Sequence, residues 1–324
     1  MICNWNKVCC QNFKSHVTFL IVFCAILWLY YAYNSSSDKP DSTKLQNNKC
    51  GLILFYHITK CGGGSFKTWL HQHTTVLEIK MVTAKDRRIK SLEELGHHKW
   101  VHWNSQIPII NDFVRKIKPN TGWKAVRLHR QFPGLYYIPK YLHYWKATVE
   151  ENGCIFHHTT ILRDPLERFV SDVNYAVPEI DIELVMESRK NWLSRYLLFG
   201  ICGYHEKEVR CGIDAKGNFN PQPNMNEHYK KELKRIMGTF NSIGFTKSFG
   251  EHLETMRRLT GWEDRNPENS KAKIVHKSVD HFDLQSKVTT HFNLTGSLLK
   301  KFVQYNREDY ILYYTTLNST NEIL

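Results

Sequence analysis

A continuous apolar run that leads directly into a glycine-rich turn is the feature that most constrains this fold. The run is LILFYHI, residues 52–58, and it has the length of a buried strand. The turn lies in HITKCGGGSF, residues 57–66, and the following SFKTWLHQH favours a helix. This order directs backbone N–H groups and the positive end of a helix toward one point. The unit therefore predicts an anion site.

The same order of strand, turn and helix recurs along the chain. Residues 154–162 (CIFHHTTIL) favour a second strand, and Pro165 suits the first position of the helix that follows. Strands are also expected at 123–129 and 242–246. Helices are expected after the strand at 242–246, as far as Thr260, and over 297–317. Strands that alternate with helices predict an α/β fold, with a central parallel sheet and helices on both faces.

An uncharged segment near the N-terminus sets the compartment. Residues 17–33 (VTFLIVFCAILWLYYAY) would span roughly 26 Å as a helix, enough for a thin bilayer. Lys7 and Lys14 precede it, so the positive-inside rule places the N-terminus in the cytosol. A cleaved signal peptide and a buried core helix are the alternatives. The expected organisation is a cytosolic tail (1–16), a transmembrane signal-anchor (17–33), a polar stem (34–49) and one lumenal domain (50–324).

The net charge points to a polyanionic partner. Lys and Arg total 44 against 31 Asp and Glu, which gives +13. With Lys7 and Lys14 in the cytosol, +11 faces the lumen. An acidic glycan is therefore the expected partner, and nucleic acid is not.

The cysteines fit an oxidising lumen. Cys50 and Cys154 each precede a predicted strand, and adjacent parallel strands would place them side by side. Cys202 and Cys211 lie nine residues apart in a polar segment, which favours a local disulfide. Cys61 is expected to remain free. Glycosylation sequons occur at Asn34, Asn293 and Asn318.

A second phosphate-binding pattern follows the second strand. In ILRDPLERFVSDVNYA, residues 161–176, Arg163 at the strand end and Ser171 two helical turns later can hold one phosphate. The alternative is an ordinary helix start, with Asp164 as the cap and Arg168 solvated. In the first motif Lys60 precedes the glycines, which excludes the nucleotide-triphosphatase order and a kinase.

Together, K-[TC]-G-G-x-[ST]-F and L-R-D-P-x-x-R-x-x-S resemble the membrane-bound Golgi carbohydrate sulfotransferases, most closely the heparan sulfate 2-O- and 6-O-sulfotransferase group. The likeness covers residues 50–315 and includes N-x-x-D-x-x-L-Y from Asn306. It implies a P-loop-like fold that binds 3′-phosphoadenosine 5′-phosphosulfate (PAPS). The implied 5′ loop is Lys60, Cys61, Gly62, Gly63, Gly64, Ser65 and Phe66, and the implied 3′-phosphate site is Arg163 and Ser171. Cys61 and Gly64 stand where the family usually has Thr or, at the second position, another small residue.

The chemistry of sulfuryl transfer suggests roles for further residues. Lys60 would stabilise charge in the transition state, and a histidine would act as general base. His129, at a predicted strand end, is the expected base, and His102 is the alternative. Basic residues near the base are expected to hold a sulfated or uronate-rich acceptor: Lys124, Arg127 and Arg130. Two further segments are weaker candidates: Lys85, Arg87, Arg88 and Lys90 for the acceptor, and His276, Lys277 and Ser278 for the nucleotide.

The sequence therefore predicts a PAPS-dependent glycan O-sulfotransferase in the Golgi membrane, with a single-pass type II topology. No zinc-spaced His/Cys cluster occurs, so no metal is expected. The missing D-x-D triplet also disfavours a metal-dependent glycosyltransferase. The alternative function is a catalytically inactive type II membrane protein that binds acidic glycans.

Overall fold

A parallel sheet forms the centre of the computed structural model, which describes residues 50–80, 92–129, 134–176, 182–200, 226–263 and 296–321. The described residues all belong to one compact unit, Asn48–Leu324. The strand order is β2-β3-β1-β4-β5, and every neighbouring pair is parallel. The strands are β1 (Gly51–His57), β2 (Thr75–Lys80), β3 (Trp123–His129), β4 (Ile155–Leu162) and β5 (Ser242–Phe245).

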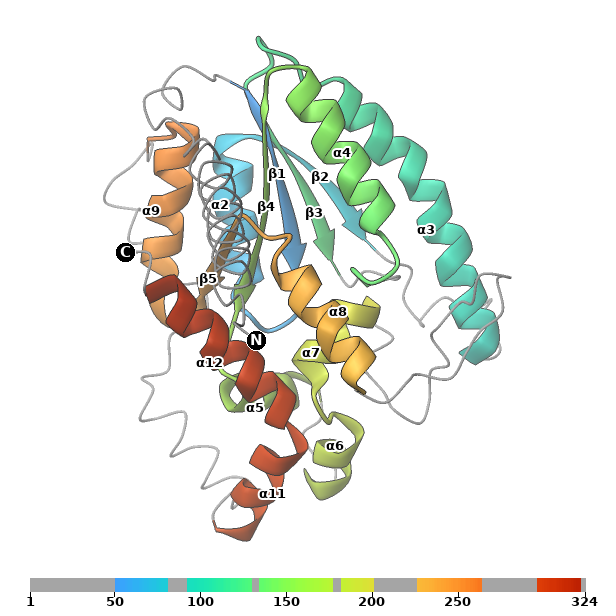
Figure 1. Ribbon diagram of the computed structural model, residues 1–324, viewed down its shortest axis with the longest axis vertical. Coiled ribbons are helices and arrows are strands. Elements are labelled where there is room, and N and C mark those ends of the chain that lie inside the picture. Colours follow the sequence, from blue (N-terminus) through green and yellow to red (C-terminus); the bar gives the residue numbers. More distant parts are fainter. Residues whose placement is uncertain are drawn as a thin grey trace, which may run out of the picture. The chain divides into compact units, whose positions relative to one another are not determined.

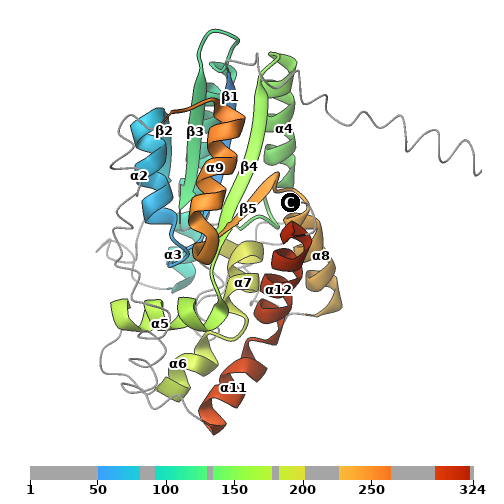
Figure 2. The ribbon, with the colours of Figure 1, turned by 90° about the vertical axis from the view of Figure 1, so that its left-hand side faces the viewer.

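Helices cover both faces of this sheet. Helices α2 (Gly63–His73) and α9 (Phe249–Thr260) lie on one face, and α3 (Leu92–Arg115) and α4 (Pro139–Glu151) lie on the other (Figures 1 and 2). The remaining helical elements are α5 (Pro165–Ala176), α6 (Ile182–Ser188), α7 (Trp192–Phe199), α8 (Glu227–Met237), η3 (Thr246–Ser248), α11 (Ser297–Tyr305) and α12 (Arg307–Asn321). Of these, α5, α6 and α11 lie beyond the carboxyl ends of the strands (Figure 1). The α/β class and the helices on both faces are as predicted.

The continuous apolar run of β1 is explained by its central position. All seven residues of β1 are buried, because neighbouring strands flank it and helices cover both of its faces. Ile53 and Phe55 pack with Phe66 of α2 and Met256 of α9. The alternate residues, such as Leu54, pack into the core that contains α3 and α4. Strand period two thus divides one apolar run between two cores.

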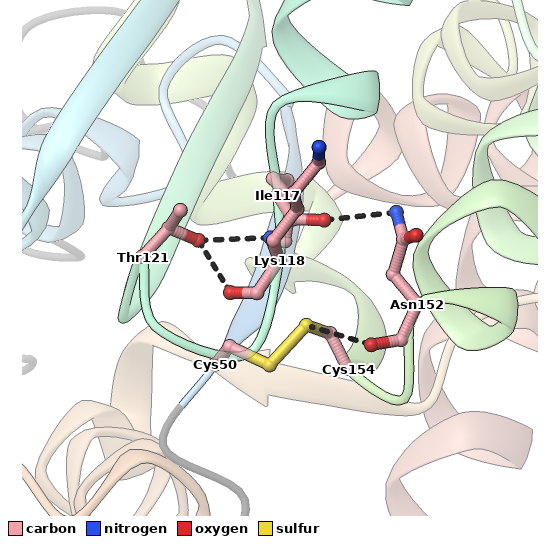
Figure 3. Close-up of a disulfide and its surroundings, with 6 residues drawn as sticks. All are labelled: Cys50, Ile117, Lys118, Thr121, Asn152 and Cys154. Carbon is pink, nitrogen blue, oxygen red and sulfur yellow. Dashed lines mark hydrogen bonds between the residues drawn. A yellow bond between two sulfur atoms is a disulfide. The ribbon is translucent and has the colours of Figure 1, made fainter.

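The predicted disulfide between Cys50 and Cys154 is confirmed (Figure 3). The two cysteines stand immediately before β1 and β4, which are adjacent and parallel, and Gly51 is in register with Ile155. Next to the disulfide, the Asn152 amide donates to the carbonyl oxygen of Ile117 at 2.9 Å. The disulfide therefore joins the amino ends of the two strands covalently, whereas loops follow their carboxyl ends.

The predicted strands at 52–58, 123–129, 154–162 and 242–246 are present within a residue or two. The elements that were not predicted are β2, α3, α4, α6, α7 and α8. The expected membrane segment (17–33) and stem (34–49) lie outside the described residues. Within the described part of the chain, no helix combines the length and the apolar character that a membrane crossing requires.

Candidate functional site

The two motifs predicted to bind phosphate meet where the strand order reverses. After β1 the chain moves through α2 to β2 at one edge, and after β4 it moves to β5 at the other edge. In open α/β sheets, ligands bind outside the carboxyl ends of the strands at such a reversal. The loop of residues 58–62 follows β1, and Arg163 follows β4. This topology supports a ligand site here independently of any motif.

The backbone of the first loop requires its unusual residues. Lys60 and Gly62 have positive φ angles of 66° and 75°. The Cys61 N–H donates to the Ile58 carbonyl at 3.4 Å, which closes the turn. A Cβ on Gly63 would overlap the His57 ring, so only glycine allows α2 to start this close to the sheet. The chain therefore passes over His57 and enters α2 directly.

The N-terminus of α2 is suited to an external anion. Its N-cap is Gly62, which has no side chain to accept from the first N–H groups, and its first turn holds no acidic residue. The start of α5 differs, because Asp164 accepts from the N–H groups of Leu166 at 2.9 Å and Glu167 at 3.2 Å. The expected alternative role of Asp164 as a cap is thus confirmed. Of the two helix starts, that of α2 is the one left for an anion.

Arg163 links the two motifs. Its Nη1 donates to the carbonyl oxygen of Lys60 at 3.4 Å, and its Nε donates to Glu167 Oε2 at 3.3 Å. Ser171, part-exposed, stands eight residues beyond Arg163, on the same side of α5 as Glu167. The guanidinium that would bind a 3′-phosphate therefore already contacts the loop that would bind the 5′ end.

A buried charge cluster supports α5 from behind. Arg168 is only 3% exposed, and its guanidinium lies 3.8 Å from the centre of the Trp192 ring. Its Nη1 lies 3.6 Å from Asp172 Oδ2, and Asp172 also pairs with Arg189. The expectation of a solvated Arg168 is wrong, because Trp192 and Asp172 enclose it. Burial of these paired charges fixes α5 against α7.

Cys61 is free, as expected, and buried beneath the loop. Burial raises the pKa of its thiol to about 12, although the nearby Arg168 and Arg163 oppose this shift. The thiol is therefore protonated at neutral pH, and its sulfur faces the core. Gly64, the other departure from the family motif, is exposed and has open space at its Cβ position.

His129, the predicted base, stands at the same edge. It ends β3 directly opposite His57 of β1, and it is partly exposed. The two imidazole rings stack with centroids 4.2 Å apart. The predicted base thus borders the first loop. The side chain of His102, the alternative base, lies outside the described residues.

The residues predicted to bind an acceptor do not gather at this edge. Lys124 is opposite Leu52, near the amino end of β3 and roughly 17 Å along the strand from His129. Arg127 is 5% exposed and contacts Glu78 and His57. Neither residue is therefore part of the acceptor-binding proposal. Arg130 lies outside the described residues.

Several other predicted residues also lie outside the described residues: Asn34, Lys85, Arg87, Arg88, Lys90, Cys202, Cys211, His276, Lys277, Ser278 and Asn293. Asn318, the third sequon, is exposed on α12.

Glu78 and its pairing with Arg127 were not predicted from the sequence. Each is a charged residue between apolar neighbours in a strand, TVLEIK and WKAVRLH respectively. Arg127 lies in the middle of the buried strand β3 and therefore requires a partner, which is the one signal that the sequence offers for this pair.

The chain matches no protein-family model and no curated protein.

Proposed function

We propose that this protein is a PAPS-dependent O-sulfotransferase that transfers a sulfuryl group to a hydroxyl of a glycan. The observation that carries the proposal is the contact between Arg163 and the carbonyl oxygen of Lys60. This contact joins two segments that lie a hundred residues apart in the sequence, and we propose that each of them binds an anion. A single phosphate needs one such segment, whereas a nucleotide with phosphates at both its 5′ and 3′ positions needs two.

Each segment has a separate task in this proposal. The N-terminus of α2, with the N–H groups of Gly63 and Gly64 and the hydroxyl of Ser65, receives the 5′-phosphosulfate. Arg163 and Ser171 receive the 3′-phosphate; to do so, Arg163 turns from Glu167 toward the nucleotide. The buried cluster around Arg168 keeps α5 in place, and this helix carries Ser171 and begins two residues after Arg163.

Lys60 and His129 perform the chemistry. In PAPS, the sulfur bonded to the 5′-phosphate oxygen is the atom that the acceptor hydroxyl attacks. The S–O bond to phosphate breaks as the new S–O bond forms, and 3′-phosphoadenosine 5′-phosphate leaves. The Lys60 ammonium stabilises the charge that develops on the departing phosphate. His129 takes the proton from the acceptor hydroxyl.

The acceptor class follows from charge and compartment. We propose a glycosaminoglycan such as heparan sulfate, because the chain carries an excess of Lys and Arg that would attract an acidic polysaccharide. A signal-anchor at residues 17–33 would place this enzyme in the Golgi membrane with the domain in the lumen. A protein that only bound acidic glycans would need neither the paired anion sites nor a base at their edge.

Substitution of Lys60 tests this assignment. In the full-length protein, Lys60→Ala should lower turnover of PAPS by about 10²–10³-fold, as loss of one charge-stabilising group does in other enzymes. Lys146→Ala is the matched control, because Lys146 is an exposed lysine of α4 that is ion-paired to Glu150 of its own helix. Equal turnover of the Lys60→Ala variant and the wild type would contradict the assignment.

A further inference from the structure

Four side chains form a continuous line on the α2 face of the sheet, and they lead from β2 to the proposed base. Glu78 of β2 is in register with Arg127 of β3. Arg127 precedes His129 by two residues, so the two share a face of β3. His57 of β1 is in register with His129. The line therefore runs Glu78, Arg127, His57, His129.

The hydrogen bonds from Arg127 determine the protonation state of His57. Nδ1 of His57 accepts from Arg127 Nε at 3.1 Å and from Arg127 Nη2 at 2.6 Å. A guanidinium can only donate, so this nitrogen carries no proton. His57 is therefore a neutral imidazole with its proton on Nε2, the nitrogen that faces the start of α2 beneath Gly63.

Glu78 holds the arginine in this orientation. Arg127 is buried, and its Nη1 lies 3.4 Å from Glu78 Oε1. The same carboxylate oxygen also lies 2.7 Å from Lys67 Nζ and 2.9 Å from His71 Nε2 on α2. The guanidinium thus uses one edge for Glu78 and the other for His57, which fixes its plane.

The His57 ring is confined and in turn confines His129. It is 7% exposed, and Gly63 lies against its edge. The Phe55 ring lies nearly parallel to it, with ring centroids 5.5 Å apart and 15° between the planes. His129 stacks on it at 4.2 Å with 22° between the planes. A rotation of the His57 ring would remove the surface on which the His129 ring rests.

We propose that Arg127 and His57 are positioning residues for His129, an inference that rests on the proposed function. Arg127 keeps His57 neutral and its plane fixed, and His57 orients the imidazole that accepts the proton. An imidazolium at position 57 would repel the charge that His129 acquires when it takes the acceptor's proton. Arg127 excludes that state because its N–H groups occupy Nδ1.

The test compares substitutions along this line with a matched control in the full-length protein. Arg127→Met removes both hydrogen bonds to His57. Arg127→Lys retains the positive charge but not the two adjacent N–H donors of the guanidinium. Combining Arg127→Met with Glu78→Gln also removes the carboxylate charge that faced the arginine. The control is His157→Gln, because His157 is a buried histidine of β4 on the same face of the sheet and bonds to Ser242 instead.

Substitution of Arg127 should lower kcat but should leave the affinity for PAPS nearly unchanged. Arg127→Met, alone or with Glu78→Gln, should lower kcat by about tenfold or more, a part of the 10²–10⁴ that a general base contributes. The dissociation constant for PAPS should change by less than about threefold, since no phosphate contact is altered. Arg127→Lys should recover part of kcat, and His157→Gln should leave kcat unchanged.

A second measurement does not depend on activity. In the full-length protein labelled with ¹⁵N-histidine, the His57 ring should show unprotonated Nδ1 and protonated Nε2 from about pH 6 to 8. That signal should vanish in His57→Phe and should titrate in Arg127→Met.

The outcomes separate this inference from the proposed function. If the wild type turns over PAPS and Arg127→Met has the same kinetics as His157→Gln, the inference is overturned and the proposed function stands. A His57 ring that titrates in the wild type would also overturn the inference alone. A wild type that neither binds nor consumes PAPS would overturn both.

Discussion

Removal of the Cys50–Cys154 disulfide should cost a large part of the stability of the domain without altering its site. The disulfide closes a loop with a sequence separation of 104 residues. Chain-entropy arguments give about 4.7 kcal/mol for a loop of about 100 residues. The double variant Cys50→Ala/Cys154→Ala should therefore unfold with a free energy lower by about 4–5 kcal/mol. For a domain of this size, the melting temperature should fall by roughly 10 °C or more.

The location of the disulfide makes the functional result specific. It joins the amino ends of β1 and β4, whereas the loop of residues 58–62 and Arg163 lie at their carboxyl ends. The length of β1, roughly 20 Å, separates the two. Below its melting temperature, the double variant should therefore bind PAPS with wild-type affinity.

Equilibrium denaturation in urea, with PAPS titration of the folded protein, is the assay. Cys61→Ala serves as the control, because Cys61 is the buried free cysteine of the described residues and its loss removes packing but no cross-link. A double variant no less stable than Cys61→Ala would refute the loop-entropy reasoning. A folded double variant with much weaker PAPS affinity would refute the separation of disulfide and site.

Two further predictions concern buried histidines and the first glycines of α2. Burial lowers the pKa of His157 to about 4, of His158 to about 3 and of His252 to about 3. The unfolded chain binds a proton at each of these histidines near pH 6.5, whereas the folded chain does not. The free energy of unfolding should therefore decrease as the pH is lowered from about 6.5 to about 4, by up to about 1.4 kcal/mol per pH unit for each histidine. Urea titrations at several pH values test this, and a flat profile between about pH 6.5 and 5 would contradict it. Gly63→Ala should displace the loop from the His57 ring and weaken PAPS binding at least about tenfold. Gly64→Ala should be tolerated, because its Cβ position is open. Equal PAPS affinities of these two variants in calorimetric titration would contradict this prediction.

The sequence predicts the centre of this fold better than its edge. The apolar run of β1 is buried along its whole length, and such a strand is recognisable by its continuous hydrophobicity. Strand β4, IFHHTTIL, is marked instead by its β-branched and aromatic residues. The adjacency of the two strands also predicts the Cys50–Cys154 disulfide. A single residue separates the edge strand β2 from α2. This strand includes Glu78 and Lys80 among its six residues, so no long apolar run marks it.

The candidate site is predictable where it is local and unpredictable where it depends on tertiary pairing. The glycine-rich loop and the residues that follow β4 are short contiguous motifs. The pairing of Arg127 with Glu78 and His57 joins residues from three strands, and only the strand order and register bring them together. For the same reason Arg127 and Lys124 resemble surface cations in the sequence, although one is buried and the other lies near the far end of β3.

The most direct test of the central claim is transfer of radiolabelled sulfate from PAPS to a polysaccharide. The full-length protein would be incubated with labelled PAPS and a panel of desulfated heparin and chondroitin acceptors, beside its Lys60→Ala variant. The account predicts label in at least one acceptor with the wild type, and almost none with Lys60→Ala. Absence of label from every acceptor, together with absence of PAPS binding by the wild type, would contradict it.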